Sequence, residues 1–322
     1  MRNIIKRIAA LLAVCILTVA VGACAQAEPL TVTAMNGPTG MGIIGLDDPA
    51  YADLWNIRLT SSAEEARAAF IAGQTDIVSL PTNLAAVLYN KLPDDGVRML
   101  AVNTLGVLYI VENGESIGSL ADLKGKKLYA TGQGSTPEYV IRWLLKENGL
   151  EDQVTLEFIE DHDTLATMLA SGLADIAMLP EPKVTAAMMK NADLRVALDV
   201  TEEYEKTAQA AGIESQMSMG CVLTRQSVID EHPEVIDAFL EAYKESVQTV
   251  NTRQAASAEI MAEKGIIPNA KIALQALPRC HIVMITGEEM KTLIAPFMDM
   301  LYASDPKSVG GALPGDDLYY IP

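Results

Sequence analysis

The stretches GQTDIVSLP, Gly73–Pro81, and GLADIAMLP, Gly172–Pro180, share five residues in the same positions, and the second begins 99 residues after the first. Each is typical of a helix that ends at a glycine in the left-handed conformation. A short apolar strand follows, and the proline ends it. We expect Asp76 and Asp175 to accept hydrogen bonds from backbone N–H groups of the turn. A helix-to-strand corner used twice predicts two halves of similar build.

The segments around both corners alternate between strand and helix patterns. Apolar runs of strand length are separated by amphipathic segments that begin near Ser, Thr, Asn or Asp. Strands are predicted over 30–35, 55–60, 76–80, 97–104, 126–131, 154–160, 175–179 and 194–200, and helices over 63–72, 83–91, 139–149, 164–172 and 181–191. Apolar strands that alternate with helices predict mainly parallel sheets covered by helices on both faces.

The position of the two prolines indicates where a ligand would bind. Open parallel sheets bind ligands in the loops beyond the carboxyl ends of their strands. Pro81 and Pro180 each stand at such an end, just before a helix begins. We therefore expect the two corners to form facing walls of one cleft.

The chain begins with the pattern of an export signal. Three basic residues precede an apolar run that is too short for a comfortable membrane span, so residues 1–23 are predicted to be a signal peptide. Val21–Cys24 resembles the lipobox of bacterial lipoproteins, which predicts that Cys24 is lipidated and anchors the protein to the outer face of the cell membrane or in the periplasm. Ordinary cleavage after Ala25–Ala27, an A-x-A site, is the alternative.

The charge of the chain excludes some classes of partner. Its formal net charge is −18, and removal of the basic leader makes it more negative. This charge argues against binding of nucleic acid or of a bare anionic membrane. Half of the residues are hydrophobic, which is enough for a packed core in two domains.

The remaining cysteines and the histidines do not indicate a metal site. Cys221 and Cys280 lie in apolar runs, so we interpret them as buried free thiols, although an exported pair could form a disulfide. His162, His232 and His281 have no ligand spacing. We predict no metal and no cofactor.

Several segments carry a family resemblance. They are the lipobox, the loop NGPTGMG at 36–42, both corners, and above all the D-L-K-G-K-x-strand-G-x-x-S pattern from Asp122 to Ser135. With these the chain resembles the substrate-binding proteins of bacterial ABC importers that have the type II periplasmic-binding fold. The most similar branch binds nitrate, sulfonates, taurine and thiamine-precursor pyrimidines. The resemblance implies a monomer that delivers a small molecule to an ABC permease and its ATPase.

The resemblance also implies how the lobes are built. The first lobe would comprise 28–108 and 223–322, and the second 109–222, each a mainly parallel sheet flanked by helices. Two crossing strands, within 105–114 and 217–227, would join them and act as the hinge. The tail, 301–322, would lie as a strap over the first lobe.

Polar residues in the loops at the strand ends are the candidate ligand contacts. Such residues also cap helices, so the group is a better prediction than any one member. The group comprises Asn36, Pro38, Thr39, Ser79, Thr82, Asn83, Asn103, Thr104, Gln133, Ser135, Thr136, Glu138 and Glu181.

The chemistry of these loops predicts the charge of the ligand. Lys183 is their only basic residue, and the carboxylates of Glu138 and Glu181 would repel an anion. We therefore expect a neutral or cationic nitrogen heterocycle. The alternative is an anion such as a sulfonate or nitrate, held by helix N-terminal N–H groups.

Two other classes of function remain alternatives. An enzyme would need a positioned nucleophile or acid–base pair, and no such motif occurs; His162 stands at a helix start. A sensor that presents its closed form to a membrane receptor is compatible with every residue named above. A neighbouring permease gene would indicate import, and a histidine kinase gene would indicate sensing.

Overall fold

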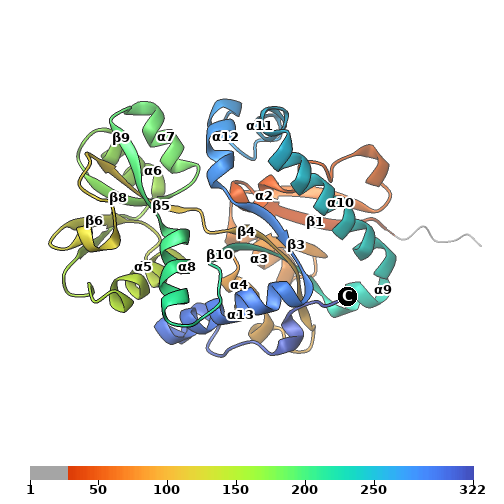
Figure 1. The fold of residues 1–322 in the computed structure, drawn as a ribbon. Helices are drawn as coiled ribbons and strands as arrows, with labels where there is room; N and C mark the ends of the chain where they lie inside the picture. Colours follow the sequence, from red (N-terminus) through yellow and green to blue (C-terminus); the bar gives the residue numbers. More distant parts are fainter. Residues whose placement is uncertain (1–27) are drawn as a thin grey trace, which may run out of the picture.

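The computed structural model describes residues 28–322 of the chain. These residues form two lobes, and each lobe is built around one β-sheet (Figure 1). The first sheet has the order β11-β4-β10-β3-β1-β2 and consists of β1 (Leu30–Met35), β2 (Trp55–Thr60), β3 (Ile77–Leu80), β4 (Val97–Leu105), β10 (Ser218–Arg225) and β11 (Ile282–Ile285). The second has the order β7-β6-β8-β5-β9 and consists of β5 (Leu108–Asn113), β6 (Lys127–Ala130), β7 (Thr155–Phe158), β8 (Ile176–Pro180) and β9 (Leu194–Asp199).

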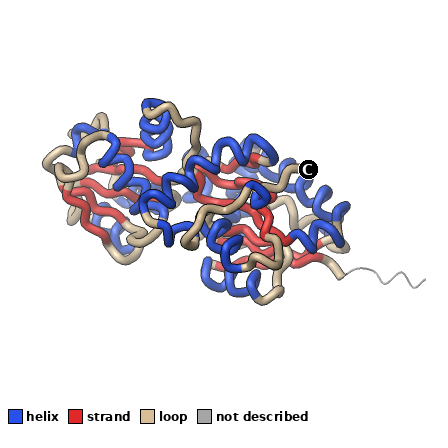
Figure 2. The backbone as a smooth tube through the Cα atoms, turned by 90° about the horizontal axis from the view of Figure 1, so that it is seen from below, coloured by secondary structure: helices blue, strands red, loops and turns tan. Residues whose placement is uncertain are grey.

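Helices cover both faces of each sheet (Figure 2). The first lobe carries α2 (Pro38–Met41), α3 (Ala63–Ile71), α4 (Asn83–Lys91), α9 (Gln226–Glu231), α10 (Pro233–Thr252), α11 (Gln254–Glu263), α12 (Ala270–Ala276) and α13 (Gly287–Ser304). The second carries α5 (Thr136–Glu147), α6 (His162–Ala170), α7 (Lys183–Lys190) and α8 (Val200–Ala210). The predicted two-lobed α/β fold is confirmed.

Both sheets are mixed, whereas the sequence analysis predicted a mainly parallel sheet in each lobe. The strand–helix repeats pair in parallel, as β1 does with β2 and β3, and as β6 does with β7 and β8. In contrast, β10 runs antiparallel to β3 and β4, and β5 runs antiparallel to β8 and β9. Of the antiparallel strands, β5 is the first after the chain enters the second lobe and β10 is the first after it returns, whereas β11 runs antiparallel to β4 within the first lobe.

The chain leaves the first sheet at Leu105 and enters the second at Leu108. It returns through α8 and the loop that precedes β10. Residues 218–222, which the sequence analysis placed in the second lobe, pair with β4 and β3 of the first sheet. The return is therefore a helix and a loop, and the whole of β10 belongs to the first sheet.

The repeated corners have the predicted conformation. Gly73 and Gly172 adopt the left-handed conformation, with φ of 68° and 75°, at the ends of α3 and α6. The Asp76 carboxylate accepts the N–H of Thr31 at 2.8 Å. That N–H belongs to the neighbouring strand β1, so Asp76 ties two strands together and does not satisfy its own turn.

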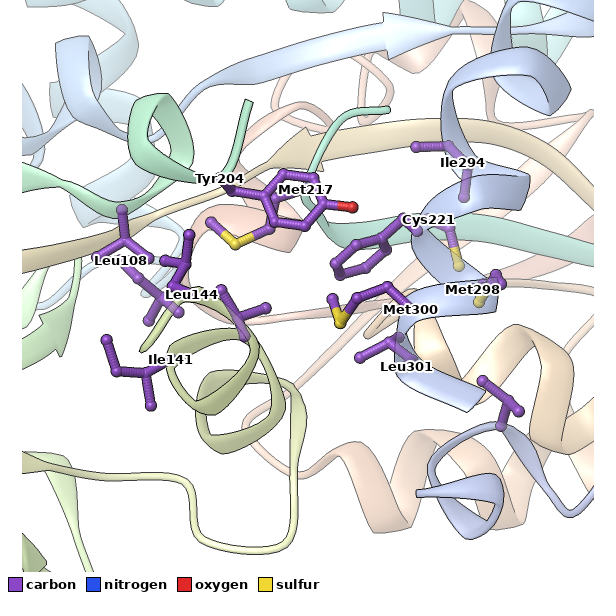
Figure 3. Packing of buried hydrophobic residues seen from close by; sticks show 14 of the residues in the cluster. Leu108, Ile141, Leu144, Tyr204, Met217, Cys221, Ile294, Met298, Met300 and Leu301 are labelled. Carbon is purple, nitrogen blue, oxygen red and sulfur yellow. The ribbon is translucent and has the colours of Figure 1, made fainter. Parts of the chain in front are cut away.

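The described residues contain three hydrophobic clusters. One packs on the first sheet around α10 and α11, and another lies in the second lobe around α6 and α7. The third includes residues of both lobes, among them Leu108 and Leu144 from the second and Phe297 and Leu301 from α13. Figure 3 shows this shared cluster, with Tyr204 between the labelled residues of the second lobe and those of α13.

The C-terminal tail lies against the first lobe, as predicted. The side chain of Asn90 in α4 donates hydrogen bonds to the carbonyls of Val309 and Ala312, at 3.0 and 2.7 Å. Near the end of the chain, the N–H of Tyr320 donates to the Met99 carbonyl in β4 at 3.0 Å. The strap thus holds α4 against the sheet.

Cys221 and Cys280 are free and buried in the described part of the chain, which confirms the interpretation as small core residues. Burial raises the pKa of both thiols. The predicted signal peptide and Cys24 lie outside the described residues. From residue 28 onward, the helices are too short or too polar to cross a bilayer.

Glu112, a buried carboxylate in β5, supports a prediction about stability. It accepts the Ile117 N–H at 3.0 Å and the Ser116 N–H and hydroxyl at 3.1 and 2.9 Å, and it pairs with Arg195. Burial acts to raise the pKa of Glu112, but these donors outweigh it and lower the pKa. Its stabilisation is therefore present above the ordinary carboxyl pKa and is lost as the pH falls through the lowered value.

We expect Glu112→Gln to lower the free energy of unfolding by about 2–3 kcal/mol at pH 7, because charge-assisted hydrogen bonds of a buried group are lost. Denaturant unfolding at several pH values measures the difference. The gap between the wild type and the variant should shrink below about pH 4. Glu115→Gln, an exposed neighbour, is the control. A gap that stays constant down to pH 3 would contradict the assignment.

Candidate functional site

The residues after Pro81 and Pro180 both contact the segments that connect the lobes. The hydroxyl of Thr82 is 2.7 Å from the hydroxyl of Ser218, the first residue of β10. The N–H of Glu181 donates to the carbonyl of Val107, just before β5, at 2.9 Å. The two corners therefore lie at the boundary between the lobes, where the sequence analysis expected them.

Four predicted residues of the first lobe form one buried polar group. The Asn103 side chain donates to the Thr39 carbonyl at 3.0 Å and to the Ser79 hydroxyl at 3.5 Å. The Thr104 hydroxyl donates to the side-chain oxygen of Asn103 at 3.1 Å. Ser79, Asn103 and Thr104 are each 1% exposed. Their hydrogen bonds hold the loop of α2 on the ends of β3 and β4, so they position the loop that carries Asn36 and Pro38.

The loop before α2 carries a polar atom with an unused hydrogen-bonding capacity. The side-chain oxygen of Asn36 is buried and has no partner among the described residues. Pro38 is the first residue of α2, where its missing N–H costs nothing. Asn36 and Pro38 thus stand directly beyond β1, beside the group around Asn103.

The two predicted residues at the start of α4 have separate roles. Thr82 is in the N-cap position, but its hydroxyl contacts Ser218, and no side chain of the described residues caps α4. The side chain of Asn83 donates to the Ser308 carbonyl in the tail at 3.0 Å. The structure therefore places Asn83 against the strap and not with the other candidates.

Four of the predicted residues lie around the start of α5, Gln133 and Ser135 in the preceding loop and Thr136 and Glu138 in the first turn of the helix. The Ser135 hydroxyl donates to the Gly132 carbonyl at 2.6 Å, so no side chain in the described chain caps α5. Thr136, the first residue of the helix, is buried, and Gln133 is exposed. Glu138 accepts the Gly134 N–H and the Arg142 guanidinium, each at 2.7 Å.

Glu181, the candidate beyond the second corner, is 2% exposed and fully engaged. It accepts Nε of Arg279 at 2.5 Å, the Thr185 hydroxyl at 3.0 Å and the Thr185 N–H at 3.1 Å. Burial raises the pKa of Glu181, and the Arg279 guanidinium and the Thr185 hydrogen bonds act in the opposite direction.

These contacts remove the reason for preferring a heterocycle to an anion. The sequence argument treated Glu138 and Glu181 as free negative charges at the binding site. Each is paired with an arginine, Arg142 or Arg279, so neither presents an uncompensated charge to a ligand. Electrostatic repulsion therefore does not favour a heterocycle over an anion at this boundary.

Arg279 was missed by the sequence analysis. It ends a short 3-10 helix, Leu277–Arg279, and lies 98 residues from Glu181 along the chain. Arg279 does not lie in a loop at the end of a predicted strand, and the candidate residues were taken from such loops alone.

His162, the first residue of α6, contacts the carboxyl end of a strand of its own lobe. Its Nδ1 is 2.6 Å from the hydroxyl of Thr131, which directly follows β6. Burial lowers the pKa of His162. Within the described residues, His, Cys, Asp and Glu form no group of three that could hold a metal ion.

A comparison with models of known protein families identifies the family of the chain. The family described as the periplasmic substrate-binding protein of phosphonate ABC transporters matches residues 55–265, which include both corners, both crossing segments and α10. The chain belongs to this family. Members of the phosphonate-binding family are substrate-binding components of transporters and not enzymes, and they deliver small molecules to a permease and its ATPase.

Solved structures share the fold of this family member. An ABC transporter protein from Parabacteroides distasonis is 23% identical, with a TM-score of 0.77, over 92% of this chain and 99% of that chain. The aliphatic sulphonate binding protein SsuA from Escherichia coli is 16% identical, with a TM-score of 0.70, over 92% of both chains. The alkanesulfonate-binding protein SsuA from Xanthomonas axonopodis pv. citri, bound to MOPS, is 12% identical, with a TM-score of 0.61, over 91% of this chain and 97% of that one. No curated protein sequence matches the chain significantly.

Proposed function

We propose that the protein captures a small organic anion, a phosphonate or a sulfonate, at the boundary between its lobes and delivers it to an ABC importer. The observation that carries the proposal is that α4 and α5, one from each lobe, begin without a side-chain cap in the described structure. The start of α4 contacts Ser218 through Thr82, and the first turn of α5 reaches the first lobe, where the Tyr139 hydroxyl donates to Asp305 at 3.2 Å. The first N–H groups of a helix are a ready site for an anion and need no cation. Two such helix starts, on opposite lobes, suit a ligand that both lobes hold.

The names of the relatives support the same ligand class. The matching family is described for phosphonate, and two structural relatives are named for sulphonates, one of them bound to the sulfonate MOPS. A neutral or cationic heterocycle has lost its electrostatic support, since Glu138 and Glu181 are paired with arginines. The thirteen predicted contacts remain the proposed neighbourhood of the ligand, except for the side chain of Asn83, which is bonded to Ser308 of the strap.

Capture would occur by closure of the two lobes around the anion. A ligand that bonds to both lobes stabilises the closed state, and about 5 kcal/mol of preference turns a mostly open population into a mostly closed one. Hydrogen bonds to helix N–H groups are charge-assisted and supply much of this preference. We further propose that Cys24 is lipidated, that the protein works as a monomer beside the membrane, and that the partners are a permease and an ATPase.

A thermal-shift panel with the chain after Cys24 tests the ligand class. We expect alkylphosphonates or alkanesulfonates to raise the melting temperature, because a ligand that binds only the folded form stabilises it. Nitrate, pyrimidines, flavins and amines complete the panel. Stabilisation by a pyrimidine or an amine alone would overturn the anion assignment.

The variant Thr136→Pro tests the helix start directly. Proline is tolerated at the first position of a helix but lacks the N–H, and Ser135 has the extended conformation that a residue before proline requires. We expect at least tenfold weaker binding of the anion, with little change in the melting temperature of the free protein. The control is Pro233→Ala at the start of α10, away from the boundary, which should bind as the wild type.

A further inference from the structure

Two guanidinium groups lie near the candidate residues, and each is neutralised by a carboxylate. Nε of Arg142 donates to Glu138 at 2.7 Å, and Nε of Arg279 donates to Glu181 at 2.5 Å. The second pair lies beside the outward crossing segment, because the Glu181 N–H donates to the carbonyl of Val107 at 2.9 Å. Neither pair offers a net positive charge to a ligand.

The starts of α6 and α7 add no net positive charge. Nζ of Lys183 in α7 lies 2.5 Å from the carboxylate of Asp163, and Asp161 places a further negative charge at the N-cap of α6. Burial lowers the pKa of His162, so its ring is uncharged at neutral pH. The loops that follow β1, β3 and β4 of the first lobe, 36–37, 81–82 and 106–107, contain no lysine or arginine.

The start of α4 offers few backbone donors. The N–H groups of Leu84 and Ala85 already donate to the carbonyls of Pro81 and Thr82, at 2.9 and 3.1 Å. Asn83, the first residue of the helix, has an N–H without a partner among the described residues. The first-lobe helix start therefore supplies one free backbone donor.

The start of α5 is limited in the same way. Pro137 has no N–H, and the N–H groups of Glu138 and Tyr139 donate to the Ser135 carbonyl at 3.0 and 3.3 Å. The N–H of Thr136 is left without a partner within the described chain. The two helix starts can thus bind an anion with neutral donors, but these donors are few.

A site of this kind discriminates by the number of charges on the ligand. The cost of taking an ion out of water grows with the square of its charge, so a dianion costs about four times as much as a monoanion of the same size. The attraction to N–H donors grows only in proportion to the charge. Without a net positive charge in the site, the second negative charge of a dianion is not compensated.

We propose that the site selects anions that carry a single negative charge. This inference rests on the proposed function and narrows its ligand class. A sulfonate has no further proton to lose and is a monoanion throughout the neutral pH range. A phosphonate, like a phosphate group, loses a second proton near neutral pH. It is accepted while it keeps that proton, and its dianion is excluded.

Two ligands of the same shape test the proposal, an alkanesulfonate and the alkylphosphonate with the same chain. Titration calorimetry measures both affinities for the chain after Cys24 between about pH 6 and about pH 9, where the phosphonate loses its second proton. We expect the sulfonate affinity to stay constant within about twofold. The phosphonate affinity should fall about tenfold for each pH unit above its second pKa, because the fraction of monoanion falls by that factor.

Releasing one guanidinium should weaken the selection. Glu181→Gln keeps an amide oxygen for the Thr185 hydroxyl but leaves no charge opposite Arg279. We expect the phosphonate affinity at about pH 9 to rise about tenfold more than the sulfonate affinity, because a dianion gains twice the attraction of a monoanion. Since Glu181 is buried, Glu138→Gln is the second variant. It frees Arg142, which is 55% exposed, and should act in the same direction by a smaller factor.

Glu115→Gln is the control for the change in net charge. Glu115 is exposed in the loop after β5, and β5 pairs antiparallel with β8 so that this loop lies at the opposite end of the sheet from Pro180. The control should leave both affinities unchanged. Thermal melting checks that each variant is folded.

Each outcome separates this inference from the proposed function. A phosphonate affinity that stays constant or rises with pH, beside a constant sulfonate affinity, would overturn the inference and leave the anion function intact. A parallel fall of both affinities would assign the pH dependence to a group of the protein and would also overturn it. An unchanged ratio of affinities in both glutamate variants would show that the paired arginines do not set the selection. If neither ligand binds at any pH, the proposed function itself fails.

Discussion

Replacing Phe297 with alanine is expected to lower the free energy of unfolding by about 3–5 kcal/mol, the usual cost of removing a buried aromatic side chain. Phe297 is fully buried and packs against Tyr204 of the other lobe. The cavity would lie in the contact between α8 and α13, so the coupling between the lobes weakens as well. We expect the single cooperative transition of the wild type to split into two in calorimetry, because the lobes then unfold separately.

A matched substitution in the first lobe separates the loss of stability from the loss of coupling between the lobes. Phe239 is also deeply buried, but it belongs to the cluster around α10 and not to the cluster that both lobes share. Phe239→Ala should destabilise the first lobe by a similar amount while Tyr204 and Phe297 stay in contact. A Phe297→Ala protein that melts in one transition with unchanged stability would show that the contact between α8 and α13 does not couple the lobes.

Gly40→Ala should damage ligand binding more than any other methyl group added near the proposed site. Gly40 lies in α2, next to Pro38 and Thr39, and a Cβ there would overlap the backbone oxygen of Met35. Backbone atoms cannot rotate away, so α2 must shift on the ends of the strands. Overpacking of this kind costs about 1–3 kcal/mol. If this cost falls on the ligand-bound form, the affinity for the ligand weakens by about tenfold to a hundredfold, because each 1.4 kcal/mol of binding free energy is a factor of about ten.

Titration calorimetry with a ligand from the panel measures this loss, and circular dichroism checks that the variant is folded. Gly118→Ala is the matched control, since a Cβ at Gly118 meets only Asp122, at an ordinary contact distance of 3.7 Å. It should bind as the wild type does. Wild-type affinity of Gly40→Ala for the same ligand would mean that the loop of α2 does not form part of the binding site.

Local sequence patterns were sufficient to predict most of the secondary structure. The predicted strands over 30–35 and 55–60 and the helix over 83–91 coincide with β1, β2 and α4. These segments are set by hydrophobic periodicity and by residues within one turn of their ends, which the sequence displays directly. The left-handed glycines of both corners follow for the same reason, as only glycine takes that conformation at low cost.

Part of the predicted group of polar residues does come together, but the charge of its carboxylates was not predicted. Ser79 near the end of β3 and Asn103 near the end of β4 meet each other and Thr39 of α2, because carboxyl ends of strands that run in the same direction share one edge of a sheet. The pairing of Glu181 with Arg279 could not be predicted, since it joins residues of different lobes that are far apart in sequence. Asn83 faces the tail for the same reason, as its partner Ser308 comes from the end of the chain.

By itself, the sequence determined the two-lobed α/β architecture, the repeated corner and the place where the two halves face each other, because periodicity, glycine conformation and strand ends are local properties. Tertiary structure alone decided the electrostatics. Whether Glu181 is a free charge depends on which distant side chains pack together across the boundary. Such contacts arise only when the whole chain has folded.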